Sequence, residues 1–262
     1  MSKTVKVLII TGAVLVCIGI IVVLAIGFTN GWQFSTAKAE YKTYETEMGA
    51  EITDIDLDFS AGTLKVEFYD GEVIKVEYPE NKQFTTQFKL TNHTLKISNV
   101  IHWHVRFLWF NKIPETRVYI PRDLTLGCKM NVSAGVVSFT SGSFANLDID
   151  ISAGSITMDN VTCNNFDLEM SAGSVNVSQV RCNMFSADLS AGSLHVKRLE
   201  CDDIDVDLSA GSATLNIAGS KSDYTIRTDV SAGSCNVGSQ SGGSKRLTVD
   251  ISAGSVSINF DN

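Results

Sequence analysis

The stretch that decides the fold is Asp148-Ile149-Asp150-Ile151-Ser152-Ala153-Gly154-Ser155. Acidic and aliphatic residues alternate as far as Ser152, which is the period of a β-strand with one buried face. The alternation stops at Ala153-Gly154, where a small residue and a glycine permit a tight corner. A short strand that ends in a corner is therefore the expected local structure.

This Ser-Ala-Gly element recurs along the second half of the chain. It begins at Ser133, Ser152, Ser171, Ser190, Ser209, Ser231 and Ser252. The successive intervals are 19, 19, 19, 19, 22 and 21 residues, and an earlier copy begins at Ser60. A near-constant period of this length predicts stacked structural units, with the few inserted residues confined to loops.

Within each unit the alternation breaks at the Ala-Gly step, again seven to nine residues after the serine, and a third time near Asn164, Asn183 and Asp202. Three short strands and three corners in 19 residues make one coil. The sequence thus predicts an all-β fold, a three-sided parallel β-solenoid whose rungs of about 19 residues occupy residues 126–262.

Residues 51–125 are less regular. They contain strand-like runs at 64–68 and 73–78, which Asp70-Gly71 is expected to join as a hairpin, and further runs at 84–90 and 95–98. We interpret residues 51–125 as an irregular N-terminal β part that caps the solenoid. A separate domain is the alternative.

The N-terminal segment predicts a membrane anchor. Residues 7–28 are uncharged and long enough to span a bilayer as a helix, a single N-terminal transmembrane helix. Lys3 and Lys6 precede this span, so residues 1–6 are expected in the cytoplasm, residues 29–50 as a tether, and the remainder outside the cell. Cleavage as a signal peptide at Ala37-Lys38-Ala39 is the alternative.

The charge balance excludes one class of partner. The chain of 262 residues has a formal net charge of −8, and residues 123–262 carry 8 basic and 16 acidic residues. Nucleic-acid binding depends on clustered lysine and arginine, so no nucleic-acid partner is expected. Any electrostatic function belongs to the acidic second half.

Repeated serines and cysteines have structural explanations. A serine nucleophile needs one positioned base, which four histidines cannot supply to eight Ser-Ala-Gly copies. Stacked hydroxyls such as those of Ser155 and Ser174 are expected to hydrogen-bond between rungs instead. Cys163, Cys182 and Cys201 also repeat at 19 residues and are expected to be buried free thiols. A line of thiols does not offer the tetrahedral arrangement that zinc requires.

The best candidate site is a column of acidic residues. An acidic residue stands two positions before the serine of most repeats, and it should face outward because both of its neighbours face inward. These residues are Asp150, Glu169, Asp188, Asp207, Asp229 and Asp250.

Like charges on neighbouring rungs, about 4.8 Å apart, repel by about 0.9 kcal/mol even in water, and a bound cation would offset that repulsion. Weak Ca²⁺ binding, or an envelope protein or polymer with cationic groups, is therefore expected at this column. A solvated face with diffuse counterions is the alternative. No resident cofactor and no defined metal site is assigned.

A second candidate surface is aromatic. Trp103, Phe107, Trp109 and Phe110 cluster in one short segment. An open solenoid end must be covered, so this segment is expected to act as part of the cap. Docking to a membrane surface or a partner is the alternative.

Two segments carry a family resemblance. The stretch from Ile55 to Gly62 and the stretch from Val118 to Leu124, together with the rungs that follow, resemble the "putative adhesin" family of membrane-anchored bacterial β-helix proteins. The resemblance implies an envelope protein without an assigned biochemical activity, and some similar members stand beside envelope-stress regulators.

We therefore expect a cell-membrane protein with a cytoplasmic N-terminus and an extracellular solenoid that acts as a non-catalytic binding or structural module. An accessory or sensor component of an envelope-stress response is the second hypothesis. A polysaccharide-active enzyme is the third. The oligomeric state and the identity of the ligand are left open.

Overall fold

The computed structural model describes residues 40–49, 51–80, 84–101 and 115–261. Within these residues the protein is all-β apart from one short 3₁₀ turn, Lys221–Asp223. The strands are β1 (Glu40–Glu45), β2 (Asp54–Phe59), β3 (Gly62–Tyr69), β4 (Lys75–Glu80), β5 (Phe84–Thr91), β6 (Thr94–Ile101), β7 (Glu115–Pro121), β8 (Leu126–Phe139), β9 (Gly142–Thr162), β10 (Asn165–Arg181), β11 (Met184–Leu189), β12 (Gly192–Glu200), β13 (Asp203–Leu208), β14 (Gly211–Ala218), β15 (Tyr224–Cys235) and β16 (Lys245–Asp261).

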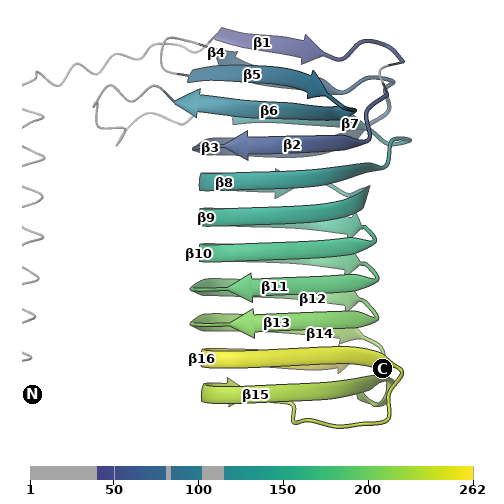
Figure 1. Ribbon diagram of the computed structural model, residues 1–262, viewed down its shortest axis with the longest axis vertical. Helices are drawn as coiled ribbons and strands as arrows, with labels where there is room; N and C mark the ends of the chain where they lie inside the picture. Colours follow the sequence, from purple (N-terminus) through teal and green to yellow (C-terminus); the bar gives the residue numbers. More distant parts are fainter. Residues whose placement is uncertain (1–39, 50, 81–83, 102–114, 262) are drawn as a thin grey trace, which may run out of the picture. The chain divides into compact units, whose positions relative to one another are not determined.

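The repeats stack in register as parallel rungs, which confirms the prediction of a solenoid-like all-β fold. Between β9 and β10, Gly154 lies beside Gly173 and Ser155 beside Ser174. Every register pair between these two strands is 19 residues apart, so one sequence period is one rung here. Figure 1 shows the rungs one above another, with the strands of each rung on a front and a rear face.

Each coil has fewer separate strands than the sequence predicts. In the coil of β11 and β12 the first corner falls at Ser190-Ala191, between the two strands. The expected second corner lies within β12, where Lys197 and Arg198 are both exposed between buried Val196 and Leu199. The second and third predicted strands are therefore one element that bends.

The repeated corner requires glycine. Gly173 has a φ of 134°, and a Cβ placed there would lie 2.0 Å from the carbonyl oxygen of Gly154 in the rung before. Both the backbone conformation and the close contact between rungs exclude a side chain. Stacking of the corners is the physical reason that the glycine recurs.

The core is a set of apolar columns that run along the stack. Leu168, Leu189 and Val206 are fully or almost fully buried, as are their equivalents in neighbouring rungs. The rings of Phe166 and Phe185 stack with centroids 5.0 Å apart and planes 14° from parallel. Neighbouring rungs thus bury these side chains against one another, as the alternation predicts, except that Val230 of β15 is 38% exposed.

The order of the last rungs differs from their order in the chain. β16 pairs with β13 and β14 on one side and with β15 on the other. After β14 the chain therefore skips the adjacent rung position and forms β15 in the position beyond it. It then returns and fills the skipped position with β16. The glycine- and serine-rich residues 238–244 form the return, where Gln240 pairs with Ile226 and donates a hydrogen bond to the carbonyl oxygen of Lys221, 2.7 Å away.

At the other end of the stack, the predicted hairpin through Asp70-Gly71 is wrong. β3 and β4 do not pair with each other, because β7 lies between them, parallel to β3 and antiparallel to β4. The hairpin forms between β5 and β6 instead, at Asn92 and His93, whose φ values of 50° and 63° suit a tight hairpin turn.

Residues 51–125 are continuous with the regular rungs. β2 and β3 both pair in parallel with β8, so they form a rung of the same stack. β1 and β4 pair in the antiparallel sense, as do β5 and β6, and these strands complete that end of the sheet.

Candidate functional site

The six predicted acidic residues form one continuous column, which we call the acidic ladder. Their order along the stack is Asp150, Glu169, Asp188, Asp207, Asp250, Asp229, and each is the register partner of the next. The structure therefore brings all of them together. Because β16 inserts before β15, Asp250 lies between Asp207 and Asp229, which the sequence does not indicate.

Strand geometry fixes the direction of these side chains. Asp188 stands between Ala187 and Leu189, which are both buried, so its own side chain points to solvent. The other members occupy the equivalent position on β9, β10, β13, β15 and β16. Figure 1 shows parts of these strands, with their labels, on the front face of the stack. Five of the six are exposed, and Asp250 is half-buried.

The charge of the ladder is not neutralised by neighbouring side chains. No lysine or arginine of the described residues forms an ion pair with any of its six members. Two basic groups close to the ladder are engaged with other carboxylates: Lys129 pairs with Asp148 at 3.2 Å, and Arg246 pairs with Asp203 at 2.6 Å. Arg227, two residues before Asp229 on β15, is exposed and forms no ion pair with the ladder.

The pKa values record this accumulation of negative charge. Partial burial raises the pKa of Asp207, and the carboxylates of Asp205, Asp250 and Asp188 raise it further. Asp205 lies two residues before Asp207 on the same strand, β13. Its pKa is also raised, chiefly by burial, although Arg246 opposes the shift. Asp205 and Asp207 thus mark the part of the face where ionisation is least favourable.

The ladder does not form a chelating metal site. Among the described residues, no group of three or more histidine, cysteine, aspartate or glutamate side chains is placed to hold a metal ion. The carboxylates follow a line, one per rung, whereas Ca²⁺ takes six to eight oxygen ligands around one point. This geometry suits a partner whose positive charges are also distributed along a line.

Amide side chains connect the exposed faces of several rungs, whereas the Ser155 and Ser174 hydroxyls do not connect theirs. The register places Ser155 beside Ser174, but the described residues show no hydrogen bond between them, contrary to the sequence-based expectation. Asn165 instead donates to Asn146 at 3.0 Å and Asn259 to Asn216 at 2.8 Å. The longer amide reaches across one rung spacing, which the short serine hydroxyl does not.

The cysteines of the described residues are free thiols, as predicted. Cys128, Cys163, Cys182 and Cys201 are buried, and Cys235 is half-buried. Burial raises the pKa of the Cys128 thiol far above its ordinary value. This cysteine therefore behaves as a small apolar side chain.

The aromatic candidates Trp103, Phe107, Trp109 and Phe110 lie outside the described residues. A different aromatic cluster packs near the end strands of the sheet, where Tyr44 of β1 stacks on Phe88 of β5 with centroids 4.1 Å apart. Tyr78 meets the same Phe88 ring edge-on at 5.0 Å. The sequence does not indicate this cluster, because its members are scattered over three strands.

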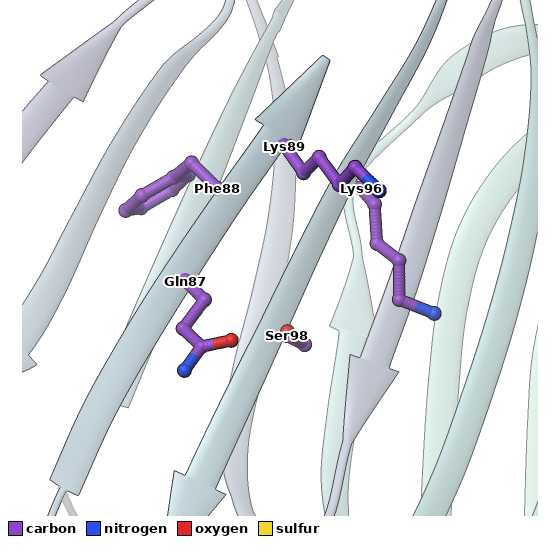
Figure 2. Close-up of a pocket in the computed structure, with 5 residues that line it drawn as sticks. All are labelled: Gln87, Phe88, Lys89, Lys96 and Ser98. Carbon is purple, nitrogen blue, oxygen red and sulfur yellow. The ribbon is translucent and has the colours of Figure 1, made fainter. Parts of the chain in front are cut away.

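The β5–β6 hairpin also carries an open depression of about 670 Å³, lined by Gln87, Phe88, Lys89, Lys96 and Ser98. Figure 2 shows these side chains on two neighbouring strands, with Phe88 and Lys96 pointing away from each other. Lys96 is engaged with Asp56 at 3.1 Å and Asp58 at 3.3 Å. The polar groups do not converge, so the depression does not define a binding site.

No helix in the described part of the chain is long and apolar enough to cross a membrane. The predicted span at residues 7–28 lies outside that part.

The stacked parallel rungs define a repeat protein of the β-solenoid type. The chain belongs to the Toastrack family (DUF4097), whose model matches residues 52–262. This match covers both the irregular and the regular parts of the stack, and it confirms the resemblance seen in the sequence.

No curated protein matches the chain. Among solved structures, a "putative adhesin" of Bacteroides fragilis is 13% identical, with 87% of this chain and 100% of that one covered and a TM-score of 0.42. A "putative cell adhesion protein" of Clostridium sporogenes is 14% identical over 86% and 100% of the two chains, with a TM-score of 0.30. A "putative lipid binding protein" of Parabacteroides distasonis is 14% identical over 86% and 98%, with a TM-score of 0.34. TM-scores and sequence identities this low carry no argument about the function of this chain.

Proposed function

We propose that the protein is a membrane-anchored, three-sided β-solenoid that serves as a non-catalytic binding or structural module on the outside of the cell. Its acidic ladder is the binding surface, and its partner is an envelope protein or polymer with cationic groups. The observation that carries this proposal is the continuous register of six carboxylates from Asp150 to Asp229 without a basic partner among the described residues.

The ladder has an energetic cost that a partner would remove. Adjacent carboxylates on neighbouring strands repel. The pKa of Asp207 is raised first by partial burial and then by the carboxylates of Asp205, Asp250 and Asp188. Anything that binds the folded state and places positive charge along this face stabilises the fold by linkage. Repulsion of this kind favours a cationic partner over a neutral one.

The geometry also favours a particular form of partner. One carboxylate per rung, at about 4.8 Å intervals, matches a chain with repeated amino or guanidinium groups better than it matches a single chelated ion. Each contact is exposed and therefore weak, so the affinity should come from many contacts at once and fall as salt screens them.

The direct test is binding of a labelled oligolysine to the full-length protein in detergent. We expect saturable binding that weakens as the salt concentration rises toward about 0.5 M. At that concentration the Debye length is about 5 Å or less, so attraction between more distant charges is largely screened. Replacing Asp188 and Asp207 by Asn should weaken binding several-fold. Asp159→Asn removes an exposed carboxylate outside the ladder and should change it little.

Equal affinity in the Asp188→Asn/Asp207→Asn and Asp159→Asn proteins would contradict the assignment of the ladder as the binding surface. So would binding of a labelled polyanion with similar affinity. Stabilisation by millimolar Ca²⁺ alone, with no effect of oligolysine, would favour an ion over a polymer as the ligand.

The anchor and the topology need a test of their own. The uncharged span at residues 7–28 and the preceding Lys3 and Lys6 support an extracellular solenoid. Protease added to intact spheroplasts should then attack residues after about residue 30 and leave the Lys3–Lys6 end protected. Recovery of a soluble protein that begins at Glu40 would show cleavage after Ala39 instead.

A further inference from the structure

Three cysteines form a second column, which we call the thiol ladder: Cys163, Cys182 and Cys201. The residues just before them are register partners, since Arg181 lies beside both Thr162 and Glu200. The backbone N–H of Cys163 donates to the carbonyl oxygen of Arg181 at 3.0 Å, and the N–H of Cys182 donates to that of Glu200 at 3.0 Å. Cys182 therefore has one thiol a single rung away on each side.

This spacing is compatible with a disulfide. Neighbouring rungs are about 4.8 Å apart, and the Cα atoms of a disulfide are usually 4.4–6.8 Å apart. Cys163 and Cys201 are two rungs apart, which is too far for a direct bond. Any disulfide within the ladder must therefore include Cys182.

The thiol ladder lies just beneath the surface at a corner of each coil. Its members are 6%, 7% and 3% exposed, and each is followed by an exposed residue, namely Asn164, Asn183 or Asp202. The other described cysteines have no thiol neighbour, because Cys128 lies beside Ile55 and Leu147, and Cys235 lies beside Val256.

We propose that the thiol ladder is a site of thiol–disulfide exchange, at which a low-molecular-weight disulfide closes a bond between Cys182 and Cys201. The thiolate of Cys201 attacks the small disulfide, forms a mixed disulfide and releases one small thiolate. The thiolate of Cys182 then attacks the sulfur of Cys201 and releases the second. The protein loses two protons and two electrons, and one small disulfide becomes two thiols.

The surroundings of the two sulfurs favour this order. The hydrogen bond with the Cys182 side chain holds the pKa of Cys201 below its ordinary value, although burial opposes this shift. The neighbouring thiols raise the pKa of Cys182. The thiolate is the attacking form, so Cys201 reacts first and Cys182 resolves the intermediate. Cys163 remains free and can replace Cys201 when that residue is absent.

Trypsin separates the three thiols, which makes the test direct. Cys163 lies in fragment 130–181, Cys182 in 182–197 and Cys201 in 199–221. The folded full-length protein in detergent is exposed to cystamine, quenched, denatured, alkylated and digested without reduction. We expect fragments 182–197 and 199–221 to be linked, and the number of alkylated thiols to fall from six to four.

The variants separate this proposal from non-specific oxidation. Cys201→Ala should divert the link to fragments 130–181 and 182–197. Cys182→Ala should abolish every link, and Cys235→Ala should leave the link as it is in the unaltered protein. Six alkylated thiols in the oxidant-treated folded protein would overturn the proposal. So would links that persist in Cys182→Ala, or links that form only after denaturation.

Discussion

At the scale of single residues, the repeat is maintained by a corner that accepts no side chain. The positive φ of Gly173 and the close approach of the Gly154 carbonyl oxygen act together. A Cβ at this position would force the two rungs apart, and the flanking strands that carry the acidic ladder would lose their register. The glycine therefore supports the ladder although it carries no charge itself.

Gly173→Ala should destabilise the protein by at least about 2 kcal/mol, because the strained backbone conformation and the contact with the preceding rung both oppose a methyl group. Ser171→Ala alters an exposed side chain two residues away and should cost well under 1 kcal/mol. Chemical denaturation of both variants measures the difference. Equal stabilities would mean that the corners do not pack as the structure has them.

A single carboxylate of the ladder should reveal the repulsion through pH. The pKa of Asp207 is raised above 3.8, so the folded state holds its proton more tightly than the unfolded state does. The free energy of unfolding therefore decreases as the pH rises through the folded pKa, and ionised Asp207 destabilises the fold at neutral pH.

Asp207→Asn should accordingly stabilise the protein at pH 7 by about 0.5–1 kcal/mol, the size of one or two screened repulsions at this distance. The gain should shrink as the pH falls through the folded pKa toward 3.8, and it should vanish below 3.8, where the carboxylic acid becomes neutral in both states. Denaturation of the two proteins between pH 7 and pH 4 measures it. A gain that is independent of pH would rule out charge repulsion as its cause.

At the scale of elements, the sequence predicts the units better than their connections. The 19-residue period and the buried columns follow from alternation and spacing, which are local properties. The position of β16 between β13 and β15 depends on tertiary pairing and not on local sequence. Its only signals in the sequence are the longer intervals before Ser231 and Ser252 and the glycine-rich residues 238–244.

The same distinction explains the misplaced hairpin. Asp70-Gly71 is a common turn sequence, but β7 pairs with both β3 and β4 and so separates them. The Asp70-Gly71 dipeptide carries no information about β7, which lies more than 40 residues further along the chain than its partners in β3 and β4. Asn92 and His93, which do form the turn, lack the glycine that usually marks one.

Hydrogen exchange can verify the order of the last rungs. β16 has a neighbour on both sides, whereas β15 pairs in parallel only with β16, and Val230 is 38% exposed where the register-paired Ile251 is 3% exposed. Amides of residues 230–235 should therefore exchange faster than those of residues 251–256. The reverse order of protection would place β16, and not β15, at the end of the stack.

At the scale of the whole molecule, the period and the acidic positions together create the ladder. Alternation makes each acidic residue face outward, and the parallel register aligns them, so every member could be identified from the sequence. The sequence could not show that Lys129 and Arg246 are already paired with carboxylates outside the ladder. Nor could it show which carboxylates lie closest, because that depends on where β16 inserts.

The proposed function requires that the acidic ladder hold electrostatic repulsion that a cationic partner relieves. Thermal unfolding of the full-length protein with and without oligolysine, compared with its Asp188→Asn/Asp207→Asn variant, tests this claim most directly. Oligolysine should raise the melting temperature of the unaltered protein by a few degrees, and it should raise that of the variant much less, because the variant begins with part of the repulsion already removed. An equal rise in both proteins, or no rise in either, would contradict the claim.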